Sequence, residues 1–165
     1  MEKLQTTIKE SFTVSGTGLH TGKSVNMTFV PAPEDHGYKF QRTDLEGEPI
    51  VDALVDYVVD VSRGTTIEQN GARINTVEHV LAALAGLEID NVLIQLDASE
   101  TPIMDGSSAP LVAELKKVGI VEQNKVREYF EVPHNISYAE EDRGVEMVAM
   151  PLDDYRLTVM IDYNS

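Results

Sequence analysis

Two adjacent residues, Glu78 and His79, are the chain's clearest candidates for chemistry. After them apolar residues recur at helical spacing, so the pair would lie in the first turns of one helix. In a metallohydrolase such an imidazole binds zinc, and such a carboxylate takes a proton from the zinc-bound water. The plainer interpretation is an amphipathic helix with two polar residues at its exposed end, and the pair alone does not exclude it.

Further zinc ligands are scarce. The His-Glu-x-x-His pattern is absent, because the order is Glu-His and Ala83 stands four residues after His79. The inverted pattern, His-x-x-Glu-His, requires a histidine where this chain has Asn75. Thiolate ligands are excluded because the chain has no cysteine. The remaining candidates are His20 and Asp105, the second of which lies in a loop rich in glycine and serine.

Two polar segments could contact an anionic substrate. The segment 62–66, Ser-Arg-Gly-Thr-Thr, offers a guanidinium and hydroxyls such as that of Thr65 shortly before the Glu78 helix. Arg143 lies in a second polar segment, which is typical of a hairpin turn. Such segments are more often plain solvated loops, so these assignments need support from elsewhere.

The elements that must position these residues are strands first and helices later. Clean alternation from Lys23 to Val30 places Val25, Met27 and Phe29 on one face of a strand. Asn70-Gly71 predicts a tight turn. Further strands are expected over residues 6–14, 38–42, 51–61 and 91–96.

Two helices are expected among these strands. The first follows Thr76 as a candidate N-cap and ends at Gly86. The second covers residues 109–118, with Ser107 or Ser108 as its cap and Gly119 as its end. The pattern predicts an α+β fold: a two-layer sandwich of a mixed or antiparallel sheet with two helices on one face.

The end of the chain repeats part of its beginning. Val25, Met27 and Pro31 recur as Val145, Met147 and Pro151, each 120 residues later, and three strands are expected over 130–138, 144–150 and 155–163. We therefore expect a first domain over residues 1–125 and the incomplete start of a second, similar domain over residues 126–165. Three strands with an open apolar face are marginal, so we also expect the chain to be truncated within that domain.

Composition narrows the partners. The chain has 165 residues, 42% of them hydrophobic, and a formal net charge of −15. This charge disfavours nucleic acids and anionic membrane surfaces as partners. No segment has the length of a signal peptide or a membrane helix, so a soluble cytoplasmic protein without membrane insertion is expected.

Four segments in register resemble one family, the zinc-dependent UDP-3-O-acyl-N-acetylglucosamine deacetylases of lipid A (lipopolysaccharide) biosynthesis. They are Gly-Thr-Gly-Leu-His-Thr-Gly at 16–22, Asn-Thr-Val-Glu-His-Val-Leu-Ala-Ala-Leu at 75–84, Gly-Leu-Glu-Ile-Asp-Asn at 86–91, and Pro-Ile-Met-Asp-Gly-Ser-Ser-Ala-Pro at 102–110. The resemblance covers essentially the whole chain. It implies two like α+β sandwich domains with the active site between their helix layers.

Site roles follow from this resemblance. It implies that His79 is one zinc ligand, that Glu78 is the general base, and that the substrate is a nucleotide-sugar glycolipid precursor. The other ligands, the general acid and a lysine and threonine near the substrate are expected beyond Ser165. Asp105 is expected to support the site, and Arg143 and Tyr163 to approach the nucleotide or sugar. Some family members are fused to a 3-hydroxyacyl-acyl-carrier-protein dehydratase.

Three hypotheses stay open from sequence. The first is the deacetylase, whose 165-residue piece alone would be inactive. The second is a non-catalytic acidic α+β module that binds a partner protein and does not need Glu78. The third is a different zinc amidase on the same fold. The resemblance favours the first.

Overall fold

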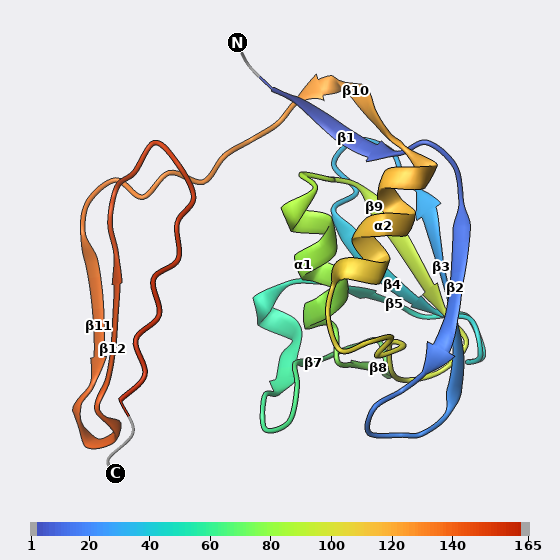
Figure 1. Ribbon diagram of the computed structural model, residues 1–165, viewed down its shortest axis with the longest axis horizontal. Coiled ribbons are helices and arrows are strands. Elements are labelled where there is room, and N and C mark those ends of the chain that lie inside the picture. The colour runs from blue at the N-terminus through green and yellow to red at the C-terminus, as the bar shows by residue number, and fades with distance from the viewer. Residues whose placement is uncertain (1–2, 163–165) are drawn as a thin grey trace. The chain divides into compact units, whose positions relative to one another are not determined.

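The computed structural model describes residues 3–162. The chain forms two compact units, which divide between Arg127 and Glu128. Over these residues the fold is α+β, with two α-helices and several sheets (Figure 1). Among the described residues no helix is long and apolar enough to cross a membrane.

A five-stranded mixed sheet is the centre of the first unit. Its strand order is β2-β3-β9-β4-β5, and every neighbouring pair is antiparallel except β4 and β9. The predicted alternation in β3 is confirmed, because Val25, Met27 and Phe29 are all buried. The strands are β2 (Phe12–Thr17), β3 (Ser24–Pro31), β4 (Tyr38–Arg42), β5 (Ile50–Asp52) and β9 (Val92–Leu96).

Smaller strand assemblies complete this unit. The single strand expected over 51–61 is wrong, because the chain breaks there into β5, a 3₁₀ turn at Val55–Tyr57 and β6. The tight turn at Asn70-Gly71 is confirmed, with φ of 53° and 75° at the two residues. An antiparallel sheet contains β6 (Val58–Asp60), β7 (Thr66–Gln69) and β8 (Ala72–Asn75), and β1 (Leu4–Ile8) pairs with β10 (Ile120–Val126).

Both expected helices form, although the N-terminus of the first differs from expectation. Helix α1 covers Glu78–Gly86 and α2 covers Ala109–Val118. Thr76 does not cap α1: the N-cap is Val77, no side chain caps the helix, and Thr76 has a positive φ of 61°. The helix ends at Gly86 as expected, with Gly86 itself as the last helical residue.

The end structure of α2 agrees more closely with expectation. The Ser107 hydroxyl accepts a hydrogen bond from the Ala109 amide at 3.1 Å, and Gly119 follows the last helical residue with φ of 93°. Ser108 is the N-cap residue but makes no side-chain capping bond.

One hydrophobic core joins the sheet to both helices. Figure 1 shows α1 and α2 beside one another within the first unit. The core cluster includes Phe29 and Ile94 of the sheet, Leu84 of α1 and Leu115 of α2, each no more than 1% exposed. Glu78 and His79 therefore stand on a helix whose apolar side is anchored in the core.

The second unit contains an antiparallel hairpin. Strand β11 (Ile136–Glu140) pairs with β12 (Val145–Ala149), and a 3₁₀ turn at Glu141–Arg143 lies between them. The expected three strands are wrong in part, because residues 150–162 form no strand and residues 130–135 lie outside β11. The expected strand up to residue 163 ends outside the described residues.

Candidate functional site

The first turn of α1 fixes Glu78. Its Oε2 accepts a hydrogen bond from the Thr65 amide at 3.0 Å, and the Val77 amide donates to the Thr65 carbonyl at 3.3 Å. Val77 is fully buried, so the backbone just before the carboxylate cannot shift freely. Glycine at position 64 leaves the carboxylate room, because a Cβ there would lie 3.2 Å from Glu78 Oε1. The 62–66 segment predicted to bind substrate thus contacts the candidate base.

His79 lies beside the loop that leads to α2. The Ser108 hydroxyl donates to the His79 carbonyl at 2.9 Å. In that loop Asp105 Oδ1 accepts from the Ser107 amide and hydroxyl at 2.9 and 2.8 Å. These bonds hold the pKa of Asp105 below its usual range, and the nearby His79 imidazole adds to the effect. The loop therefore keeps a negative charge near the candidate ligand.

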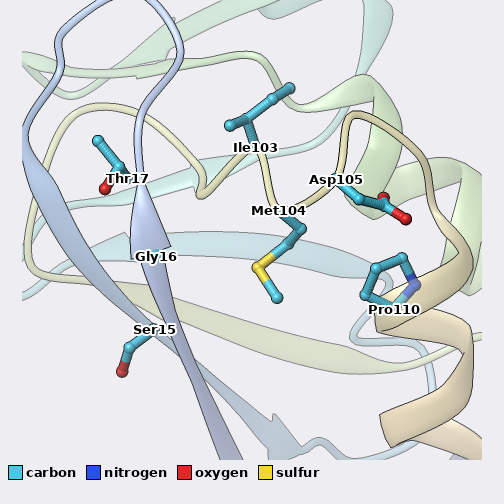
Figure 2. A pocket seen from close by; sticks show the side chains of 7 residues that line it. All are labelled: Ser15, Gly16, Thr17, Ile103, Met104, Asp105 and Pro110. Carbon is cyan, nitrogen blue, oxygen red and sulfur yellow. The ribbon is translucent and has the colours of Figure 1, made fainter.

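A hollow of about 490 Å³ opens between β2 and this loop. Figure 2 shows Met104 projecting toward the strand, with Asp105 and Pro110 on the α2 side. Its lining residues are Ser15, Gly16, Thr17, Ile103, Met104, Asp105 and Pro110.

His20 uses one ring nitrogen to hold a neighbouring loop. Its Nε2 lies 3.0 Å from the Arg63 carbonyl oxygen. Because a carbonyl oxygen only accepts, Nε2 carries the hydrogen, and Nδ1 is the ring nitrogen left for another partner. A second, polar hollow of about 230 Å³ adjoins this contact, lined by His20, Asp60, Ser62, Arg63, Gly64, Thr66, Asn75 and Thr76.

Sequence reasoning missed Glu100, a carboxylate that is 1% exposed. It accepts hydrogen bonds from the His20 and Thr21 amides and from the Thr76 hydroxyl. Burial by itself would raise the pKa of Glu100, but the His20 and Thr21 amides and the hydroxyls of Thr21 and Thr76 outweigh it, and the pKa is lowered. Its neighbours, Ser99 and Thr101, are polar, so local pattern does not distinguish it from a solvated loop residue.

The metal-binding capacity of this part of the chain is limited. Within residues 3–162 no three histidine, aspartate or glutamate side chains come together to hold a metal ion. Structural and catalytic zinc sites use at least three protein ligands. His79 can supply one imidazole, and the donor set of the described residues stops short of a complete site.

The remaining predicted substrate contacts belong to the second unit. Arg143 is exposed in the turn between β11 and β12, and its guanidinium donates to Glu140 at 3.0 Å. Tyr163 lies outside the described residues. The structure thus gathers Glu78, His79 and the Thr65 segment in the first unit.

Comparison with known proteins places the chain in a family. The family model for UDP-3-O-acyl N-acetylglycosamine deacetylase, LpxC, matches residues 5–165. The bifunctional enzyme LpxC/FabZ of Bacteroides thetaiotaomicron is 45% identical over 161 residues, which are 98% of this chain and 35% of that protein. The bifunctional enzyme LpxC/FabZ of Chlorobaculum tepidum is also 45% identical, over 98% of this chain and 34% of that protein.

A single-function relative gives a similar match. The UDP-3-O-acyl-N-acetylglucosamine deacetylase of Xanthomonas campestris pv. campestris is 42% identical over 160 residues, 97% of this chain and 52% of that protein. The chain therefore spans about a third to a half of the length of these relatives. Because the family model matches nearly every residue and the relatives align over almost the whole chain, the chain belongs to the UDP-3-O-acyl N-acetylglycosamine deacetylase family.

Proposed function

We propose that the full-length protein hydrolyses the acetamide of UDP-3-O-(3-hydroxyacyl)-N-acetylglucosamine and releases acetate, a step of lipid A biosynthesis. Family membership and the name of the Xanthomonas relative support the substrate. The observation that carries the chemistry is the Glu78 carboxylate, held by the Thr65 amide at the start of α1 and followed directly by His79.

In the proposed reaction Glu78 is the general base. It takes a proton from the water that attacks the acetyl carbonyl carbon, so that a carbon–oxygen bond forms as the proton moves to the carboxylate. The carbon–nitrogen bond then breaks, and the leaving amine receives a proton from a general acid that we place beyond Ser165. The Thr65 amide binds Oε2, which leaves Oε1 as the basic atom nearer to Gly64.

His79 is the proposed zinc ligand from this part of the chain. Zinc, when bound, would polarise the acetyl carbonyl and lower the pKa of the attacking water. The remaining ligands are proposed to come from beyond Ser165. Asp105 and His20 are proposed as supporting residues, since one adds negative charge near His79 and the other holds the Arg63 carbonyl.

Thr65, Arg143 and Tyr163 are proposed substrate contacts. Thr65 is supported by its place beside Glu78, and Arg143 by its exposure. A cytoplasmic location is part of the same proposal, and cell fractionation tests it. The match to bifunctional and single-function relatives alike leaves both forms open for the full-length protein.

We further propose that residues 1–125 are a two-layer sandwich and that residues 126–165 begin a second copy. The core shared by the sheet and both helices supports the first point. The second rests on the repeat of residues 25–31 at 145–151, since the repeated positions lie in or beside the strands β3 and β12.

Kinetics of the full-length protein test the role of Glu78. We expect Glu78→Gln to lower kcat by about 10²- to 10⁴-fold, the usual contribution of a positioned general base. Glu68→Gln is the matched control, because Glu68 lies on β7 and pairs with Arg73 at 2.8 Å. It should leave kcat within about twofold, as exposed ion pairs contribute little.

The outcome separates the open hypotheses. If Glu78→Gln left deacetylation intact, the general-base role would be refuted, and the non-catalytic interaction module would gain support. If the wild-type protein deacetylated other acetamides but not the UDP-linked substrate, a different amidase on this fold would replace the proposal.

A further inference from the structure

The Glu100 carboxylate lies where two segments of the candidate site meet. Oε1 accepts from the His20 amide and the Thr76 hydroxyl, both at 3.0 Å. Oε2 accepts from the Thr21 amide at 2.8 Å and from the His20 amide at 3.2 Å. One buried side chain thus binds the loop between β2 and β3 and the residue two positions before Glu78.

The first connection to Glu78 passes through His20. Glu100 holds the His20 backbone, and the His20 ring donates to the Arg63 carbonyl at 3.0 Å. Two residues later the Thr65 amide donates to Glu78 Oε2 at 3.0 Å. The position of the amide that orients the candidate base therefore depends on the loop that Glu100 anchors.

The second connection passes through Thr76. Its φ of 61° is unusual for a β-branched residue and persists only where surrounding contacts hold it. Glu100 binds its hydroxyl, and the Thr101 hydroxyl donates to its carbonyl oxygen. The next residue, Val77, donates its amide to the Thr65 carbonyl at 3.3 Å. Both connections therefore meet at Thr65, whose amide binds Glu78.

The local packing suits a carboxylate in particular. A Cβ at Gly18 would lie 2.4 Å from Glu100 Oε2, so the loop backbone closes tightly over the charge. A glutamine amide would face one of the backbone amides with its own N–H groups in either orientation, because both oxygens accept from the backbone. Only an ionised glutamate satisfies every donor.

We infer that Glu100 is a positioning residue that holds Glu78 in its working orientation through the His20 loop and Thr76. This inference rests on the proposed deacetylase function, because it assigns Glu100 a part in that reaction. Glu100 acts through backbone amides and a hydroxyl and does not itself touch the reacting atoms in this scheme.

Glu100→Gln in the full-length protein is the main test, with Asp90→Asn as its matched control. Asp90 lies at the opposite end of β9, where it accepts from the Thr6 amide at 2.7 Å and pairs with Arg127 at 2.8 Å. Both substitutions convert a carboxylate that binds a backbone amide into its isosteric amide. Their effects on the melting temperature should therefore be similar, whereas their effects on catalysis should differ.

Steady-state kinetics and hydrogen exchange supply two separate measurements. We expect Glu100→Gln to lower kcat by about 10- to 100-fold with a change in KM below about threefold, as misplacement of a catalytic group does. Exchange of whichever of the His20 and Thr21 amides then faces the glutamine N–H groups should accelerate at least about tenfold, because that amide loses its acceptor. Asp90→Asn should keep kcat within about twofold and leave those two amides protected.

A second pair of variants tests the connection through Thr76 without touching the carboxylate. Thr76→Val preserves shape but removes the hydroxyl, and it should lower kcat with little change in KM. Thr76→Ser keeps the hydroxyl and should retain most of the wild-type kcat. Equal losses in the two variants would overturn this connection.

The decisive outcomes are distinct. An active wild-type enzyme whose kcat is unchanged by Glu100→Gln would overturn the inference and leave the proposed function standing. The inference would also be overturned if kcat fell in proportion to the melting temperature, and by the same proportion, in Glu100→Gln and Asp90→Asn. Glu100 would then be only a structural residue. A wild-type protein without deacetylase activity would overturn the proposed function itself and, with it, the positioning role of Glu100.

Discussion

Two glycines should respond to the same substitution with opposite signs. Gly71 has a φ of 75° in the turn between β7 and β8, whereas Gly86 is the last residue of α1 and lacks a positive φ. An added Cβ would meet nothing within 4 Å at either position. Conversion to alanine therefore tests backbone conformation at both sites without a steric clash.

The expected free energies follow from that difference. At Gly71 the left-handed conformation costs an L-residue roughly 1–2 kcal/mol, and the reduced entropy of the unfolded chain returns about 0.4–1 kcal/mol. Gly71→Ala should thus lower the free energy of unfolding by about 0.5–1 kcal/mol. Gly86→Ala should raise it by about 0.5–1 kcal/mol, because alanine is favoured over glycine in helices.

Urea unfolding of the 165-residue chain, followed by circular dichroism, measures both values. The two variants should differ by about 1–2 kcal/mol, and each melting temperature should move by about 2–4 °C per kcal/mol. A destabilised Gly86→Ala would show that α1 ends before Gly86. A stabilised Gly71→Ala would refute the turn geometry between β7 and β8.

Three further outcomes are expected. Phe29 is fully buried and stacks on Phe12 with ring centroids 4.8 Å apart. Phe29→Ala should therefore lower the free energy of unfolding, measured by urea titration, by about 3–5 kcal/mol. A decrease of less than about 2 kcal/mol would contradict the place of Phe29 in the core. The pKa of Glu100 is lowered in the folded state, so its ionised form stabilises the fold at pH values above the unfolded-state pKa near 4.3. The difference in free energy of unfolding between wild type and Glu100→Gln should therefore shrink as the pH falls below about 4. A difference that stays constant with pH would count against an ionised Glu100. The described residues hold no complete metal site, so the 165-residue chain should retain clearly less than one zinc ion per chain after dialysis. Tight stoichiometric zinc in metal analysis would contradict His79 as the single zinc ligand of this chain.

The parts of the fold that the sequence predicted well are those with a strong local period. Alternation in residues 24–31 and helical spacing after residue 77 each reflect burial of one face, and both elements form. Residues 51–61 were harder, because a valine-rich segment resembles one strand although the chain crosses there from one sheet to another. The sequence does not predict strand β10, because its residues are mainly exposed and polar. The strand forms by pairing with β1, which lies more than 100 residues earlier in the chain.

Thr76 shows why a correct helix can have a wrong cap. A threonine just before an apolar helical period is a common N-cap, and the sequence supports that interpretation. In the structure its hydroxyl binds Glu100 instead, and its backbone adopts φ of 61°. A contact across 24 residues of sequence therefore replaced the local one, and local propensity contains no information about such a contact.

The candidate site shows the same division between local and distant information. Glu78 and His79 can be proposed from the sequence because their side-chain types and their adjacency suggest a general base beside a metal ligand. Glu100 binds mainly backbone amides, which every residue except proline possesses, so its partners leave no signature in the sequence. The loop it anchors lies about 80 residues earlier in the chain. Residues that react can be proposed from sequence, but the residues that hold them in place must be sought among buried polar groups whose hydrogen bonds only the folded chain reveals.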